Sequence, residues 1–232
     1  MLKLENTEIV GWEHAIRGMR NPKNSWAKSD SVFTPHELED WPHDTVKTFD
    51  DLGPNDYTLM SQLADGGPVH AKYRRMIAVY VDITAPLYWW KEFDTYKVGT
   101  VANSCSTMHK IAAKEFTLDD FSCEHLQGPC LVNLEGTIKL LNYYRGLFND
   151  TVEHDRRDKL DGEKVKKDWW WQMIQLLPTS YNQKRTIMLN YEVLVGIYKW
   201  RRNHKLDEWH TFCDWIEELP YSELITGRKG ED

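Results

Sequence analysis

Hydroxyl, amide and imidazole side chains are concentrated in residues 99–109, GTVANSCSTMH. Thr100, Asn103, Ser104, Ser106 and His109 could each donate or accept a hydrogen bond. Small polar residues are typical of a loop in which a ligand approaches the backbone closely. The segment is therefore a candidate binding site for a small polar molecule, and an ordinary Ser/Thr-rich connection is the alternative.

Two regular elements would position this loop. Residues 76–84, MIAVYVDIT, are rich in β-branched and aromatic side chains, which predicts a strand. Pro86 ends that strand or opens the next element, and residues 87–96, LYWWKEFDTY, predict a short helix. Strand, helix and polar loop in succession are one way to build a binding site.

Upstream of this unit, the chain predicts short elements joined by polar turns. Residues 7–20 predict either a strand followed by a helix or one helix broken near Gly11. Residues 35–48 predict a short acidic helix start, and Asp56 is placed to cap a helix over 57–64.

Downstream of it, helical patterns dominate. Thr117, followed three residues later by Asp120, predicts a helix start. Residues 131–148 carry apolar side chains at helical spacing and predict a buried helix. The C-terminal third predicts three helices, of which the first ends near Leu177-Pro178 and the others span about 182–203 and 206–219.

Basic residues and one thiol are further candidates. Arg74 and Arg75 precede the strand at 76–84 and could meet a phosphate or form interface salt bridges. Residues 17–28 place four cations among amides and hydroxyls, which predicts either an anion site or a solvated surface. Cys105, within the polar loop, is either a reactive thiol or a small structural residue.

Residues 85–110 resemble the signature region of the flavin-dependent thymidylate synthases (ThyX). In that family a strand leads to Ala-Pro, an aromatic-rich helix and the motif RHRxxSxNExSxRY. Ala85-Pro86 lies at the matching point, and Lys91 and Phe93 match a basic and an aromatic position. Thr95, Tyr96 and Lys97 replace the Arg-His-Arg triplet. With one inserted residue, the later motif positions fall in order on Thr100, Asn103, Ser104, Ser106, Met108 and His109.

The C-terminal third resembles the same family. Its members carry a helix ending in Leu-Pro, an Asn-x-Arg, a Leu-Arg and a final helix. Leu177-Pro178 matches the Leu-Pro, and Asn190 matches the Asn, with Glu192 where Arg is usual. Trp200-Arg201 matches the Leu-Arg, whose Arg contacts the nucleotide in the family. The resemblance is clearest over residues 57–219.

The resemblance implies an α+β fold, with a central β-sheet flanked by helices and a helical C-terminal third, in a single domain over residues 1–232. It implies FAD as cofactor and dUMP or a related pyrimidine nucleotide as substrate. By this matching, the flavin would contact His70, Tyr96, Lys97, Asn103 and Asn190. The nucleotide would contact Lys91, Thr100, Ser104, Ser106, His109 and Arg201. Because the family's flavin sites lie between subunits, it also implies a homotetramer.

The chain departs from the family where cations hold the ligands. The motif arginines are replaced by Thr95, Lys97 and Met108, and the motif Glu by Ser104. Arg presents a planar fork of donors, which a point charge such as Lys does not reproduce. Three hypotheses follow: a divergent flavoenzyme of altered substrate, a noncatalytic ligand-binding or scaffold relative, and an authentic thymidylate synthase with unusual residues. No residue is assigned a catalytic role on these grounds.

Charge, hydropathy and cysteine spacing exclude several classes of protein. The formal net charge of −7 and pI of about 5.7 argue against a general nucleic-acid binder, which needs a basic face. No apolar run reaches the length of a membrane span. The first residues, MLKLENTEIVGW, lack a signal-peptide core, and the four cysteines have no metal-ligand spacing. We therefore expect a cytoplasmic protein with reduced thiols and no bound metal.

Overall fold

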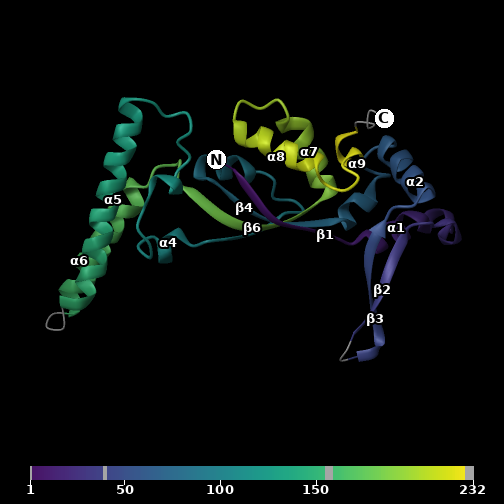
Figure 1. Cartoon of the computed structure of the whole chain (residues 1–232), viewed down its shortest axis with the longest axis horizontal. Coiled ribbons are helices and arrows are strands. Elements are labelled where there is room, and N and C mark those ends of the chain that lie inside the picture. The colour runs from purple at the N-terminus through teal and green to yellow at the C-terminus, as the bar shows by residue number, and fades with distance from the viewer. Residues whose placement is uncertain (1, 39–40, 155–158, 228–232) are drawn as a thin grey trace. The chain divides into compact units, whose positions relative to one another are not determined.

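The computed structural model describes residues 2–38, 41–154 and 159–227, and it describes no side chains within 37–46 and 151–161. Four strands form one sheet in the order β1 (Lys3–Val10), β4 (Ala78–Pro86), β6 (Asn182–Asn190), β5 (Val101–Ser104). Helices accompany the sheet, so the expected α+β class is confirmed (Figure 1).

Strand β4 forms where alternation of side chains predicts a strand. Val79, Val81 and Ile83 are buried, whereas Tyr80 between them is exposed. The Leu87 N–H bonds to the Tyr181 carbonyl at 3.0 Å, and the Tyr191 N–H bonds to the Ile77 carbonyl at 3.2 Å. These bonds at the two ends of the pair show that β4 and β6 run antiparallel.

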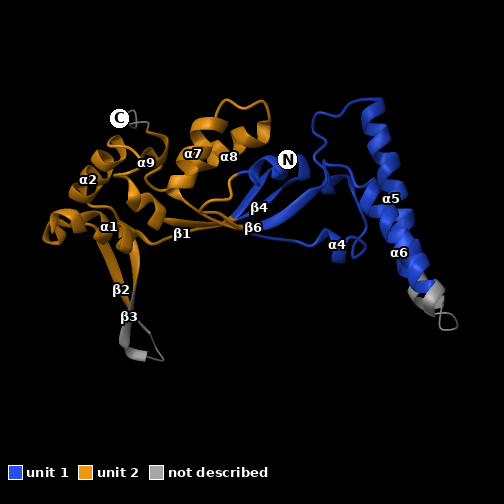
Figure 2. Ribbon diagram, turned by 180° about the vertical axis from the view of Figure 1, so that it is seen from behind, with its two compact units in different colours: residues 1–5, 82–95, 102–186 blue, residues 6–81, 96–101, 187–232 orange. Residues whose placement is uncertain are grey.

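The chain divides into two compact units, each described by itself (Figure 2). Unit 1 comprises residues 1–5, 82–95 and 102–186. It contains α3 (Leu87–Phe93), α4 (Thr107–Lys110), a 3-10 turn at Leu118–Asp120, and the paired helices α5 (Pro129–His154) and α6 (Lys159–Leu176). Its core gathers apolar residues of the loop after α4, of α5 and of α6, namely Ile111, Phe116, Phe121, Leu134, Ile138, Leu141 and Met173.

Unit 2 comprises residues 6–81, 96–101 and 187–232. Its helices are α1 (Trp12–Arg20), α2 (Pro54–Asp65), α7 (Tyr191–Arg201), α8 (Asp207–Glu217) and α9 (Glu223–Thr226). Strands β2 (Val32–Leu38) and β3 (Trp41–Asp51) form a separate antiparallel pair, and 3-10 turns lie at Asn21–Lys23, Trp26–Lys28 and Lys72–Met76. Of the two alternatives for residues 7–20, a strand followed by a helix is confirmed.

The helix predicted over 182–203 is wrong in its first half, because residues 182–190 form β6. Ile187 and Leu189 are buried on alternate positions, and the sheet satisfies the backbone between two neighbouring strands. Asn190 then caps α7, since its Oδ1 accepts from the Val193 N–H at 3.1 Å. The helical C-terminal third therefore holds one internal strand.

The predicted helix start at 35–48 is also wrong, because its described residues lie in β2 and β3. Phe33 pairs with Phe49 across the two strands, their ring centroids 5.5 Å apart. Phe49 in turn stacks on Trp12 of α1 at 4.7 Å. Cross-strand aromatic packing of this kind favours extended backbone over the helix that the acidic residues suggested.

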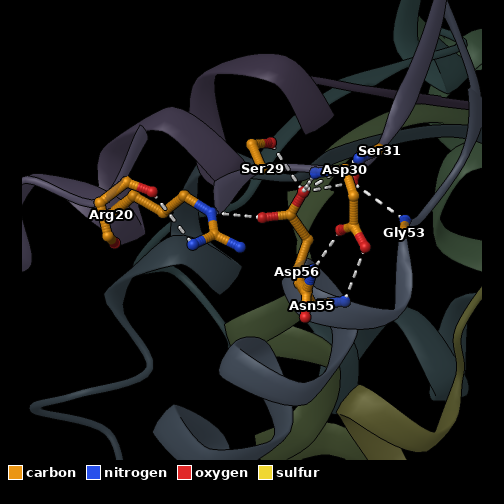
Figure 3. A network of polar contacts seen from close by, with 8 residues as sticks. Arg20, Ser29, Asp30, Ser31, Gly53, Asn55 and Asp56 are labelled. Carbon is orange, nitrogen blue, oxygen red and sulfur yellow. Dashed lines mark hydrogen bonds and ion pairs between the residues drawn. The ribbon is translucent and has the colours of Figure 1, made fainter. Parts of the chain in front are cut away.

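Asp56 is not the cap of α2, because its carboxylate is buried in a polar network (Figure 3). It accepts from Arg20 Nε at 2.5 Å and from the hydroxyls of Ser29 and Ser31, each at 2.7 Å. Asp30 takes the role expected of Asp56, accepting from the Asn55 N–H at 3.0 Å. The network joins α1, the loop before β2 and the first turn of α2.

Candidate functional site

Most of the signature segment lies in unit 1, where it forms three short elements. Strand β4 ends at Pro86, α3 follows, and the polar stretch forms β5 and α4 rather than one continuous loop. Asn103 and Ser104 are exposed on β5. Ser106 caps α4, where its Oγ accepts from the His109 N–H at 3.1 Å. These side chains could meet a ligand with neutral hydrogen bonds.

In unit 2, Arg201 lies against aromatic rings instead of extending into solvent. Its Nε donates to the Tyr96 hydroxyl at 2.9 Å, and its guanidinium carbon lies 4.6 Å from the centroid of a Trp209 ring. Tyr96 and Trp209 meet edge to face at 6.1 Å. Both cation–π contact and the hydrogen bond hold the guanidinium in one orientation. The expected proximity of Arg201 to a nucleotide stays a prediction.

Next to this cluster in the chain, the Gly99–Thr100 turn approaches the start of α7. Gly99 has a φ of +77°, and a Cβ there would lie 3.1 Å from both Asn190 Nδ2 and Val193 Cγ2. A side chain at this position would be strained and crowded, so glycine fits where other residues do not. Thr100 Oγ1 is buried and has no hydrogen-bond partner in the described part of the chain.

The remaining predicted ligands are exposed. His70 lies in the turn after α2, where its N–H bonds to the Gly67 carbonyl at 3.0 Å. Lys91 is exposed on α3 in unit 1, and Lys97 is exposed in the turn after it, in unit 2. The structure thus places Tyr96 with Arg201 and Asn190 with Gly99, and the ligand roles stay predictions.

A hollow in unit 2 was not predicted from the sequence. It has a volume of about 1260 Å³ and is lined by α2, by Arg74, by α7 and by α9. Such a volume is above the roughly 300–1,000 Å³ of most small-molecule sites. None of the eleven predicted ligands lines it. A signal was present in α2, where Tyr57, Ser61 and Asp65 recur every four residues and so share one helix face.

Arg74 and Glu192 face each other in the wall of this hollow. Arg74 Nη1 lies 3.8 Å from Glu192 Oε2, which is an ion pair but too long for a hydrogen bond. The two side chains are only 9% and 19% exposed. Arg74 Nε and Glu192 Oε2 are buried and have no hydrogen-bond partner among the described residues. A buried donor and a buried acceptor are therefore left for a ligand or water to satisfy.

Arg202, another cation in the wall of the hollow, already has partners. Arg202 lies 3.5 Å from Glu217 Oε1 and also pairs with Asp214. Burial raises the pKa of the Tyr57 phenol, and the nearby Glu223 raises it further, so this hydroxyl stays protonated at neutral pH. The hollow therefore presents charged groups of both signs, among them Asp65, Lys199 and Glu223, beside the under-satisfied Arg74–Glu192 pair.

The structure is similar to two crystal structures of thymidylate synthase X (ThyX) from Helicobacter pylori, both with FAD and dUMP. The TM-scores are 0.62 and 0.61, and each match covers 97% of this chain and 97% of the other. The chain has a ThyX-like fold. Sequence identity is only 13% and 14%, so the likeness extends to the fold alone.

Sequence comparison adds no relative. No protein-family model matches the chain, and no curated protein matches it by sequence. The ThyX-like fold expected from the motifs is thus confirmed by three-dimensional structure alone. In the described part of the chain, no helix is both long and apolar enough to cross a bilayer.

Proposed function

We propose that this chain is a divergent ThyX-like protein that binds a flavin, a pyrimidine nucleotide or both, and acts as a flavoenzyme of altered substrate. The observation that carries the proposal is the ThyX-like fold over 97% of the chain, shared with proteins crystallised with FAD and dUMP. FAD, when bound, would supply the redox chemistry, and the protein would supply binding and orientation.

The Arg74–Glu192 pair fits an edge of the flavin ring or of a pyrimidine. Both ring systems present an N–H beside a C=O, and the hollow offers a buried acceptor, Glu192 Oε2, beside a buried guanidinium donor. A ligand that satisfied both would relieve two unmade hydrogen bonds, each costing about 1–3 kcal/mol when left unmade. The resemblance places Arg at position 192, so Glu192 with Arg74 would give this chain a different hydrogen-bonding preference.

The signature residues would bind their ligand mainly through neutral groups. We propose that His70, Tyr96, Lys97, Asn103 and Asn190 serve the flavin, and that Lys91, Thr100, Ser104, Ser106, His109 and Arg201 serve the nucleotide. Neutral hydrogen bonds are about half as strong as charge-assisted ones. A neutral or weakly charged ligand therefore suits these residues better than a nucleotide monophosphate.

A catalytically inactive ligand-binding or scaffold protein of the same fold is the second candidate. It is favoured by the replacement of the motif arginines by Thr95, Lys97 and Met108. In either case we propose a homotetramer of single-domain chains in the cytoplasm. Trp200, which is 71% exposed, and Trp171, which is 39% exposed, are aromatic side chains that association could cover.

Absorbance and titration of the purified protein test flavin binding. We expect flavin absorbance bands in the protein as purified or after addition of FAD, and quenching of flavin fluorescence on titration. The double variant Arg74→Gln with Glu192→Gln should weaken FAD or pyrimidine binding about tenfold or more, because it removes both charges without leaving one buried alone. Arg75→Gln is the matched control, since Arg75 is adjacent and exposed.

Two outcomes would contradict the proposal. A colourless protein that binds neither FAD nor a pyrimidine nucleotide at millimolar concentration would exclude the flavoenzyme and leave the scaffold. Equal FAD affinity in the double variant and in the Arg75→Gln control would exclude the hollow as the binding site of the flavin ring. The signature residues would then be the remaining candidate site.

A further inference from the structure

Helix α5 is apolar on two opposite faces, and the described residues cover only one of them. Its inner face carries Leu134, Ile138 and Leu141, whose side chains are at most 9% exposed in the core of unit 1. Met173 of α6, in the same core, is fully buried. This face accounts for the packing of α5 on α6, seen in Figure 1 as a helical pair.

The outer face carries Val132, Leu140 and Tyr143, which are 65%, 50% and 60% exposed. At 100° per residue, these positions and Gly136 fall within one stripe on the side of α5 opposite to Leu134 and Ile138. A soluble helix normally places polar residues on its exposed face. The outer stripe therefore has the character of a surface that another element covers.

Gly136 lies at the centre of this stripe. A Cβ added there would have no atom of the described residues within 4 Å, so no neighbour among them requires a glycine. Gly in a helix interior costs about 1 kcal/mol relative to Ala. Val132 and Leu140 lie one helical turn before and after Gly136. Because Gly136 has no side chain, a second helix could approach the α5 backbone closely at this point.

Charges beside the stripe indicate which helix packs against it. Glu135 and Lys139 are both exposed and lie on the same flank of the stripe, four residues apart. Neither has an ion-pair partner within the described residues. In an antiparallel pair of α5 helices related by a two-fold axis near Thr137, Glu135 would face Lys139 of the partner subunit, twice. A parallel two-fold pair would instead place this flank against the opposite flank of the partner helix, which carries the uncharged Asn133 and Thr137.

We propose that the outer stripe of α5, comprising Val132, Gly136, Leu140 and Tyr143, packs against the same stripe of a second copy of this chain in an antiparallel, two-fold contact. The contact is isologous, as closed symmetric oligomers require. It rests on the self-assembly proposed above and names the surface that makes it, and it does not depend on ligand binding.

Light scattering on the full-length protein tests the contact. We expect the wild type to be oligomeric at micromolar concentration. Leu140→Lys should lower the mass to half or to that of the monomer, because it buries an unpaired charge within the contact. Far-UV circular dichroism and a cooperative thermal transition should show that Leu140→Lys is still folded, since Leu140 is half exposed within the subunit.

Charge reversal tests the antiparallel register. Glu135→Lys and Lys139→Glu should each weaken association about tenfold, since each turns two attractive pairs into two repulsive ones. The double reversal should restore the wild-type affinity. Glu163 and Lys167 on α6 are exposed and have the same spacing, so their reversals are the matched control and should leave the mass unchanged.

A monomeric wild type, or an oligomer whose mass Leu140→Lys does not change, would overturn the contact. A double reversal no better than the singles would overturn its antiparallel register. Flavin absorbance is read on the same samples. A yellow monomer would therefore refute the contact and leave the proposed flavin binding standing. A colourless oligomer that does not bind added FAD, and whose association follows the charge reversals, would support the contact and exclude flavin binding.

Discussion

At the scale of single residues, Asp56 shows how a charge is held inside unit 2. It is fully buried, and its partner Arg20 is 3% exposed. Burial alone raises the pKa of the Asp56 carboxyl, but hydrogen bonds from Ser31, Ser29, Arg20 and the Asp30 amide outweigh it, so the pKa lies below its ordinary value. The carboxylate is therefore charged in the folded state at neutral pH.

We predict that Asp56→Asn destabilises the protein by about 3–5 kcal/mol at pH 7, because Arg20 keeps a buried charge without its counter-ion. A carboxyl whose pKa is lowered by folding stabilises the fold above the unfolded pKa, near 3.8, and this contribution is lost as pH falls through the folded pKa. The difference between wild type and variant in urea unfolding should thus shrink below pH 4.

Asp65→Asn is the control for this series, because Asp65 lies on the same helix and is exposed. We expect it to change the free energy of unfolding by about 0.5 kcal/mol or less at every pH. If the difference in unfolding free energy between wild type and Asp56→Asn stays constant between pH 7 and pH 3, folding does not lower the pKa of the Asp56 carboxyl.

The cysteines differ in reactivity because burial also changes the pKa of a thiol. Cys213 is fully buried, and burial raises the pKa of its thiol to about 11, whereas Cys105 and Cys130 are exposed. We predict that a thiol reagent at pH 8 modifies Cys105 and Cys130 in the native protein and spares Cys213. Mass spectrometry of labelled peptides checks this, with urea-unfolded protein, in which all react, as the control. Labelling of Cys213 at the rate of Cys105 would contradict the buried position.

At the scale of elements, the junction between β1 and α1 depends on Gly11. Its φ is +95°, and a Cβ there would lie 2.1 Å from the Met76 carbonyl oxygen. That distance is far inside contact range, and the obstacle is backbone. The backbone at residue 11 can therefore lie against the backbone at residue 76 only because position 11 has no side chain.

We predict that Gly11→Ala costs about 3 kcal/mol or more of unfolding free energy, from a strained φ and displacement of the 3-10 turn that holds Met76. Gly196→Ala in α7 is the contrasting substitution, since a Cβ there meets nothing within 4 Å. It should be neutral or stabilise by up to about 1 kcal/mol. Chemical denaturation of both variants measures the difference, and equal stabilities would contradict the close approach.

At the scale of the whole molecule, a ThyX-like fold without the motif arginines should not work as a thymidylate synthase. We predict that the chain fails to support growth of a thymidine-requiring strain and that dUMP binds much more weakly than micromolar. Each lost charge-assisted hydrogen bond costs about 1.5–3 kcal/mol. Thr95, Lys97 and Met108 stand where the family has the arginines that make such bonds, so several are lost. Growth without thymidine, or a micromolar Kd by calorimetry, would show that other cations compensate.

Much of the element order could be predicted from local sequence. Strand β4, the Ala85-Pro86 break, helix α3, the Thr117–Asp120 capping box and helix α5 all form at or near the predicted positions. These features depend on side-chain periodicity, on proline and on capping within a few residues. The family motifs added the fold, since they preserve order and spacing even where the ligating residues have changed.

Only the tertiary structure decided the features that depend on distant partners. The local sequence predicts a helix over residues 182–190, but these residues form a strand because β4 and β5 pair with their backbone on both sides. The local sequence also predicts that Asp56 caps α2, but its carboxylate instead accepts a hydrogen bond from Arg20. The pairing of Arg74 with Glu192 joins residues more than a hundred positions apart, so no local pattern could indicate it. The sequence by itself determined where helices and strands could form and which fold they would share. The structure decided which polar atoms were left without partners, because that depends on what each side chain meets after the chain has folded.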